Sequence, residues 1–138
     1  MSKMILVLCT GNSCRSQIAE GYLRELAGDK ADVYSAGLEA HGVNPMAIAT
    51  RLEDGIDISG QTSDKVDKYF KMHFDFVITV CDNAREHCPY FPDNTKIFHH
   101  NFPDPAKAKG SDDQIKNEFR LVRQQIKEYC KLFVEENL

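Results

Sequence analysis

The chain of 138 residues is long enough to bury one hydrophobic core without disulfides or metals, so we expect a single domain over residues 1–138. Its net charge of −4 gives no overall attraction to nucleic acid or to an anionic membrane, and neither is expected as a partner. No stretch approaches the roughly 20 apolar residues of a membrane span, and the apolar run over residues 4–8 is too short for a secretory signal. We therefore expect a cytoplasmic protein.

Short apolar runs and helical patterns alternate along the chain. The predicted order is strand, helix, strand, helix, helix, strand, strand, helix. The strands are expected at residues 4–8, 32–35, 74–81 and 95–98, and the helices at residues 16–27, at 45–53, from 63 or 64 onward, and from 111 almost to the C-terminus. This alternation is typical of an α/β fold, here a four-stranded parallel sheet with helices on both faces in three layers.

The last predicted helix carries a one-sided apolar stripe. Its members follow one another at steps of three or four residues: Ile115, Phe119, Val122, Ile126, Tyr129 and Phe133. The stripe predicts packing against the core. Cys130 beside it is expected to be a buried thiol without a chemical role.

The cysteines are the most informative residue type. There are five of them: Cys9, Cys14, Cys81, Cys88 and Cys130. In a reducing compartment, clustered cysteines indicate catalysis, redox chemistry or metal binding more often than structural disulfides. Cys9 and Cys81 each end a predicted strand, and open parallel sheets bind ligands beyond the carboxyl ends of their strands. We therefore expect these two thiols at the same edge of the molecule.

The loop "CTGNSCR", residues 9–15, lies between a buried strand and a helix. Its backbone N–H groups have no helical partners and can surround a tetrahedral oxyanion, helped by the helix dipole. Gly11 is expected to take a positive φ, with Asn12 the next residue type that tolerates it. Arg15 can close the cradle with two parallel donors. The residues expected to bind the oxyanion are Thr10, Gly11, Asn12, Ser13, Cys14, Arg15 and Ser16.

The same N–H dipoles and the Arg15 guanidinium favour a thiolate at Cys9. We expect a lowered pKa for this thiol and therefore a nucleophile at neutral pH. Other interpretations stay open at this point. Cys9 could be a buried structural thiol, or it could bind zinc with Cys14, although no second cysteine pair has finger-like spacing. A metal site could also draw on the histidines His73, His87, His99 and His100.

Several motifs resemble one family over the whole chain. "CTGNSCRSQIAEG" resembles the signature loop of low-molecular-weight protein tyrosine phosphatases, and is closer still to the thioredoxin-coupled arsenate reductases built on that fold. "YSAGLEAHGVNP", "GIDISGQTSD" and "DPA" occur in the expected order. The pair Cys81 and Cys88 after a predicted strand is the feature that favours the reductases over the phosphatases.

The resemblance implies reduction of arsenate to arsenite, a reaction of arsenic detoxification in which thiols supply the electrons. Cys9 would attack arsenate, Arg15 would bind the oxyanion, and Asp104 would protonate the departing oxygen. Cys81 would then attack Cys9 and release arsenite, and Cys88 would attack Cys81 to leave a disulfide that thioredoxin reduces. Phosphate and sulfate are expected to bind as mimics of arsenate, and the protein is expected to be a monomer.

The resemblance has two further consequences. The segment "DNAREH" between Cys81 and Cys88 predicts a short helix that has to loosen before these thiols meet, because a disulfide needs α-carbons within about 7 Å. Reductases of this type also often hold a potassium ion beside the loop. The matching oxygen-bearing residues here are Asn12, Ser35, Thr62 and Asp64. No other cofactor is implied.

Two other functions compete with this interpretation. A low-molecular-weight tyrosine phosphatase would share the loop, but such enzymes commonly carry an aromatic residue after Asp-Pro, where this chain has Ala106. A thiol- or metal-binding redox sensor would use the same cysteines without catalysis. The chain also departs from the reductase pattern just before Asp104, where "FHHNFPDP" stands in place of a Trp-Gly pair and a second acid found in many relatives.

Overall fold

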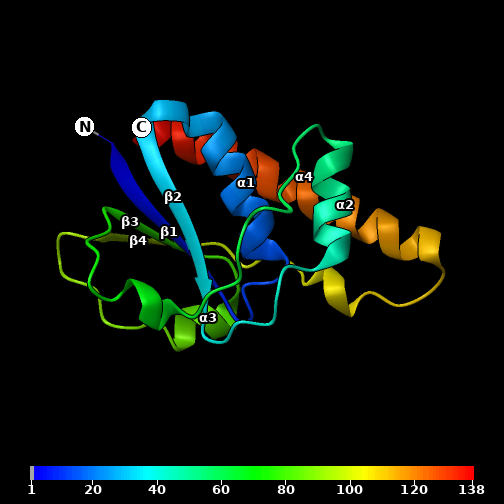
Figure 1. Cartoon of the computed structure of the whole chain (residues 1–138), viewed down its shortest axis with the longest axis horizontal. Helices are drawn as coiled ribbons and strands as arrows, with labels where there is room; N and C mark the ends of the chain where they lie inside the picture. Colours follow the sequence, from blue (N-terminus) through cyan, green and yellow to red (C-terminus); the bar gives the residue numbers. More distant parts are fainter. Residues whose placement is uncertain (1) are drawn as a thin grey trace.

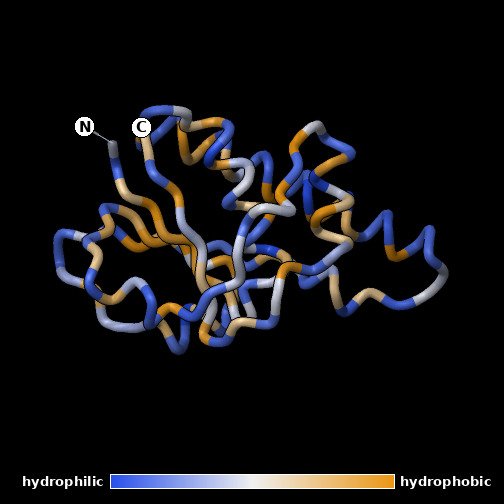
Figure 2. Tube along the Cα trace, in the orientation of Figure 1, coloured by the Kyte–Doolittle hydropathy of each residue, from blue (hydrophilic) through white to orange (hydrophobic). Residues whose placement is uncertain are grey.

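The computed structural model describes residues 2–138 and contains a sheet of four strands (Figure 1). The strands are β1 (Lys3–Cys9), β2 (Ala31–Gly37), β3 (Phe76–Thr79) and β4 (Lys96–His99). They are all parallel and lie in the order β2-β1-β3-β4, which confirms the predicted sheet. Figure 2 shows hydrophobic residues gathered along these strands. Within the described residues, no helix is both long and apolar enough to cross a membrane.

Helices and turns cover both faces of the sheet. The α-helices are α1 (Arg15–Ala27), α2 (Pro45–Glu53), α3 (Asp82–Glu86) and α4 (Asp112–Asn137). α1 and α4 lie side by side on one face (Figure 1), where the ring of Phe133 lies 5.3 Å from that of Phe76 on β3. On the other face, Tyr34 of β2 packs 5.4 Å from Tyr69 of a 3-10 turn (Val66–Tyr69). The middle of β1 is fully buried between these layers, so the three-layer prediction is confirmed.

Capping residues set where α2 and α4 begin. Asn44 precedes α2, and its Oδ1 accepts the N–H of Met46 at 2.8 Å, while Pro45 occupies the first helical position. Ser111 precedes α4 and forms a capping box with Gln114, in which each side chain accepts the backbone N–H of the other residue. Both helices start where the sequence predicts.

The apolar stripe of α4 lies in the core, as predicted. Its buried members are Phe119, Val122, Ile126 and Phe133. Cys130 is 1% exposed, and its Sγ lies 3.9 Å from the carbonyl oxygen of Ala19. Because burial raises the pKa of Cys130, this thiol stays protonated, which agrees with its predicted inert character.

Two predicted elements differ in the structure. No α-helix starts at residue 63 or 64, because the Asp64 carbonyl accepts the Gly37 N–H at 2.9 Å and Lys65 pairs with Gly37, which keeps the backbone extended beside β2. Only the 3-10 turn Val66–Tyr69 follows. The strand expected over residues 74–81 is shorter, because the chain leaves the sheet after Thr79 and Cys81 becomes the cap of α3.

Candidate active site

Cys9 and Cys81 lie at the same edge of the sheet, as predicted, because β1 and β3 are parallel neighbours. The loop after Cys9 borders a cavity of about 280 Å³ at this edge. The cavity is lined by Cys9, Thr10, Gly11, Ser13, Cys14 and Arg15 from the loop and α1, and by His41, Asp104, Ala106 and Lys107 from elsewhere. The structure thus brings Cys9, Arg15 and Asp104 to one cavity. Two of the predicted oxyanion residues, Asn12 and Ser16, are fully buried and do not line it.

Asn12 sets the shape of the loop from behind. Its φ is 48°, a left-handed conformation that few residues other than glycine adopt. Its Nδ2 donates to the hydroxyls of Ser16 and Ser35, both at 2.8 Å. Its Oδ1 accepts the backbone N–H of Asp64, also at 2.8 Å. These three hydrogen bonds tie the loop to α1, to β2 and to the segment that follows α2.

The prediction that Gly11 takes a positive φ is wrong, because the left-handed residue is Asn12, whose side-chain hydrogen bonds hold it there. Gly11 is instead packed against an imidazole. A Cβ on Gly11 would lie 2.5 Å from Nδ1 of His41, whose backbone N–H donates to the Gly11 carbonyl at 2.9 Å. Nε2 of His41 lies 2.6 Å from the Glu39 carboxylate. His41 is a cavity residue that the sequence does not reveal, since "HGVNP" carries no signal beyond that of a loop.

Arg15 and Asp104 flank the opening of the cavity. Nη1 of Arg15 donates to the carbonyl of Phe102 at 3.0 Å, and Nη2 lies 3.7 Å from Oδ2 of Asp104. The other carboxylate oxygen of Asp104 accepts the N–H of Ala106 at 3.0 Å, which fixes its direction. Both side chains line the same cavity, an arrangement in which a cation could bind an oxyanion while an acid protonates a departing oxygen.

Cys9 and Cys81 are neighbouring thiols at this edge of the sheet, and each residue is 3% exposed. The adjacent Cys9 lowers the pKa of Cys81, and the Thr10 hydroxyl and the Ala84 N–H, both 3.4 Å from its sulfur, lower it further. The adjacent Cys81 and burial raise the pKa of Cys9, although the Arg15 charge opposes them. The lowered pKa predicted for Cys9 is therefore not found in this arrangement, because burial and the adjacent Cys81 outweigh the Arg15 charge.

Thr10 is positioned to donate to Cys81. Nδ2 of Asn83 donates to the Thr10 hydroxyl oxygen at 3.0 Å, which leaves the hydroxyl proton free for the sulfur. A Thr10→Val variant is therefore expected to raise the pKa of Cys81 and to slow alkylation of this thiol about 10-fold at pH values below that pKa, with little change at neutral pH. The rate should recover as pH rises, because thiolate then forms without the hydroxyl.

The measurement for this prediction is the pH profile of Cys81 alkylation, followed by peptide mass spectrometry. Thr10→Ser keeps the hydroxyl and is the matched control, with a profile close to that of the unmodified protein. A Thr10→Val profile that coincides with the unmodified one would contradict the assignment of Thr10 as the donor.

Cys14 and Cys88 differ from this pair. Burial raises the pKa of Cys14 to about 12, so this cavity-lining thiol stays protonated. Cys88 is half-buried beyond the end of α3, and burial raises its pKa as well. The short helix predicted between Cys81 and Cys88 is confirmed as α3. At about 1.5 Å per residue a helical segment from Cys81 to Cys88 spans roughly 10 Å, too far for a disulfide, and all five cysteines are free.

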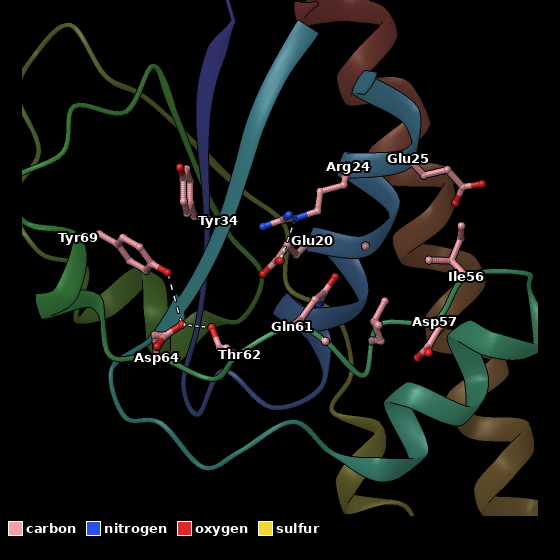
Figure 3. Close-up of a pocket in the computed structure, with 13 residues that line it drawn as sticks. Glu20, Arg24, Glu25, Tyr34, Ile56, Asp57, Gln61, Thr62, Asp64 and Tyr69 are labelled. Atoms are coloured by element: carbon pink, nitrogen blue, oxygen red, sulfur yellow. Dashed lines mark hydrogen bonds and ion pairs between the residues drawn. The ribbon is translucent and has the colours of Figure 1, made fainter. Parts of the chain in front are cut away.

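Two of the four residues predicted to hold potassium, Thr62 and Asp64, line a second cavity of about 520 Å³, whereas Asn12 and Ser35 do not (Figure 3). Thr62 donates to the Asp64 carboxylate and Ser35 donates to the Glu20 carboxylate, both at 2.6 Å. Figure 3 shows the Glu20 and Asp64 side chains reaching this cavity from different segments. Hydroxyl and carboxylate oxygens suit a hard cation, so this set fits potassium. Asn12 fits less directly, because its amide nitrogen faces Ser35.

Glu20 is the member of this set that the sequence does not reveal. It is 4% exposed, and burial raises its pKa against the opposing effects of Ser35 and Arg24. One sequence signal could have identified it: Glu20 is an acidic residue on the face of α1 that packs against the sheet. The structure does not support the zinc site at Cys9 and Cys14 or the histidine metal site. Residues 2–138 contain no group of three or more His, Cys, Asp or Glu side chains arranged for a metal.

Known proteins share this fold and this loop. The family model for low molecular weight phosphotyrosine protein phosphatases matches residues 4–138. An arsenate reductase of Halalkalibacterium halodurans is 51% identical over 133 residues, which is 96% of each chain. A solved arsenate reductase in its oxidized state has a TM-score of 0.83 at 35% identity, covering 99% of this chain and 98% of its own.

Another solved structure, an arsenate reductase in its phosphate-binding state, has a TM-score of 0.78 at 36% identity and covers 97% of this chain and 98% of its own. The matches span nearly the full length on both sides. The chain therefore belongs to the low molecular weight phosphotyrosine protein phosphatase family and, within it, to the arsenate reductases built on that fold.

Proposed function

We propose that this protein reduces arsenate to arsenite, with Cys9, Cys81 and Cys88 acting as successive thiols. The observation that carries the proposal is that two buried thiols, Cys9 and Cys81, lie at one edge of the sheet beside a cavity that contains Arg15. A phosphatase needs one nucleophilic cysteine. Reduction of As(V) to As(III) needs two electrons, which two thiols supply when they become a disulfide. The relatives named arsenate reductase support the same reaction.

The first step is attack on arsenate by Cys9. The proton of Cys9 moves to Cys81, the neighbouring thiol, while the sulfur of Cys9 forms a bond to arsenic. One arsenic–oxygen bond breaks, and the oxygen leaves as water after it takes a proton from Asp104. Arg15 and the N–H groups of the loop hold the remaining oxygens. Arsenic is still As(V) in this adduct.

The second step transfers the electrons. Cys81 gives its proton to an oxygen of the arsenic adduct, which the Thr10 hydroxyl and the Ala84 N–H favour by stabilising the thiolate, and the thiolate attacks the sulfur of Cys9. A sulfur–sulfur bond forms and the sulfur–arsenic bond breaks. The electron pair of the broken bond stays on arsenic, which leaves as arsenite. Two thiols are oxidised to one disulfide, and arsenic gains two electrons.

The third step carries the oxidation away from the cavity. Cys88 attacks Cys81, so a Cys81–Cys88 bond forms while Cys9 leaves as a thiolate. This exchange moves no net electrons, and it regenerates the nucleophile. A dithiol protein, which we propose to be thioredoxin, then reduces the new disulfide. We further propose that the enzyme works as a monomer in the cytoplasm, where thiols are kept reduced.

The test is mass spectrometry of the reduced protein after arsenate is added and free thiols are alkylated. The proposal predicts arsenite in solution and a disulfide between Cys81 and Cys88. A phosphatase would leave all cysteines reduced, and a redox sensor would release no arsenite. Arsenite release without this disulfide would contradict the three-thiol sequence. Phosphate in place of arsenate is the matched control, because it binds the same cradle and accepts no electrons.

Hydrolysis of small aryl phosphates is the second candidate activity. The family model supports it, and so does the cavity, since Cys9, Arg15 and Asp104 could form and protonate a thiol–phosphate ester as they do the arsenate adduct. Ala106 at the cavity offers no aromatic ring to flank a phosphotyrosine. We therefore propose this activity as a residual one.

We also propose that Glu20, Ser35, Thr62 and Asp64 hold a potassium ion. When bound, the ion would supply positive charge behind the loop, where Ser35 and Asp64 also anchor Asn12. Potassium chloride is expected to raise the thermal midpoint by a few degrees over choline chloride at equal ionic strength. A Glu20→Gln variant should lose this difference, while Glu128→Gln, exposed on α4 and not lining this cavity, should keep it. An equal shift in Glu20→Gln would contradict the site.

A further inference from the structure

Residues 99–104, which we call the strap, connect β4 to Asp104 and also contact the start of α3. Nε2 of His99 lies 2.8 Å from Oδ1 of Asp82, and Oδ1 of Asn101 accepts the backbone N–H of Asp82 at 3.0 Å. Asp82 is the first residue of α3 and directly follows Cys81. Two side chains of the strap therefore hold one residue at the N-terminus of this helix.

The sheet holds His99 in place. It is the last residue of β4, and its Nδ1 lies 2.7 Å from the hydroxyl of Thr79, a fully buried residue on β3. A neutral imidazole with its proton on Nε2 satisfies both contacts, since it donates to Asp82 and accepts from Thr79. The contact with α3 is thus made from a rigid element.

The other end of the strap reaches the oxyanion cavity. The Phe102 carbonyl accepts a hydrogen bond from Arg15 at 3.0 Å, and Asp104 lies 3.7 Å from the same guanidinium. The Phe102 N–H donates to the Val80 carbonyl at 3.1 Å, which fixes the strap against the end of β3. The strap therefore joins the residue that faces the oxyanion to the helix that separates the later thiols.

Oxidation of Cys81 removes another contact that holds α3. In the reduced protein the sulfur of Cys81 accepts the N–H of Ala84 and caps the helix. In a disulfide this sulfur carries no negative charge and is a weak acceptor. A helix of five residues has little stability of its own. After the first disulfide forms, the start of α3 is still held by the contacts of His99 and Asn101 with Asp82 and by the hydrogen bond from Asn83 to Thr10.

We propose that His99, Asn101 and Asp82 form a clasp that keeps α3 folded and thereby sets how fast Cys88 reaches Cys81. His99 and Asn101 are positioning residues for the exchange step, not catalytic ones. The effect of the clasp on the exchange step rests on the proposed three-thiol sequence. The restraint of α3 by the clasp does not depend on that sequence.

The restraint is tested first, in the reduced protein without arsenate. Hydrogen exchange of the α3 amides and the alkylation rate of Cys88 are compared between the unmodified protein and the Asn101→Ala and His99→Gln variants. Loss of one solvent-accessible hydrogen bond is expected to speed both about 3- to 10-fold. His73→Gln is the matched control, because His73 pairs at 3.8 Å with Asp75 away from α3. Rates in both clasp variants equal to those of this control would overturn the clasp.

The consequence is tested by a single turnover with arsenate, stopped by alkylation at successive times. The readout is the ratio of the Cys81–Cys88 disulfide to the Cys9–Cys81 disulfide. The clasp predicts that this ratio rises sooner in Asn101→Ala, an effect that a general loss of stability would not produce. A ratio that rises no sooner would overturn the proposed control of the exchange. Absence of the Cys81–Cys88 disulfide from the unmodified protein would overturn the thiol sequence instead, and hydrogen exchange would still decide the clasp.

Discussion

A Cys88→Ser variant is expected to release about one arsenite per protein molecule and then stop. Cys9 and Cys81 suffice for the first reduction, but their disulfide lies where each residue is only 3% exposed, out of easy reach of a reductant protein. Without Cys88 this disulfide has no route to the surface. A Cys81→Ser variant should release no arsenite, because nothing then attacks the Cys9 adduct. The measurement is arsenite formed against time with excess thioredoxin.

Aryl phosphate hydrolysis separates this prediction from general damage. It should largely survive in both variants, since ester hydrolysis uses Cys9, Arg15, Asp104 and water and needs no second thiol as an electron donor. Cys130→Ala is the matched cysteine control, because this thiol is buried against α1 and should support repeated turnover. Unchanged repeated turnover by Cys88→Ser would show that the oxidation leaves the site by another route.

An Arg15→Lys variant is expected to lose about 100- to 1,000-fold in kcat/KM for arsenate and to bind sulfate weakly. Lysine keeps the charge but offers no planar fork of donors for two oxygens of a tetrahedral anion. It also cannot hold both the Phe102 carbonyl and the Asp104 carboxylate, which the guanidinium contacts through separate nitrogens. The loss in kcat/KM should therefore be larger than moving the positive charge by itself would cause.

The measurement pairs steady-state kinetics with sulfate titration and a thermal melt. Arg120→Lys is the control, because Arg120 forms an exposed pair with Glu53 on α2, far from the cavity in the chain and in the fold. A loss below about 10-fold with sulfate affinity unchanged would show that the loop N–H groups bind the anion without Arg15.

The sequence predicts most of the fold because the relevant signals are local. Residues 4–8 form one buried apolar run, Asn44 and Pro45 mark a helix start, and the stripe of α4 repeats over several turns. The exception at residues 63–64 has a long-range cause. The backbone of Asp64 pairs with Gly37 of β2, and no local pattern records that pairing.

The candidate site divides in the same way. Cys9, Arg15 and the ends of the strands follow from the loop motif and the rules of parallel sheets. The pKa of Cys9 does not, because it depends on the adjacent Cys81, which follows a neighbouring strand. His41 and Glu20 also escape prediction. Their roles come from packing against Gly11 and Ser35, residues that the fold brings to them.

The left-handed backbone at Asn12 bears on how the loop meets its ligand. A non-glycine residue at φ of 48° carries a conformational penalty of about 1–2 kcal/mol. Hydrogen bonds to Ser16, Ser35 and Asp64 offset that penalty within the folded protein, before any anion arrives. The loop is therefore preorganised before the oxyanion binds, and binding requires little change of its backbone conformation. The free-energy cost of ordering the loop is thus met during folding, by residues that do not contact the anion, and does not reduce the affinity for the anion.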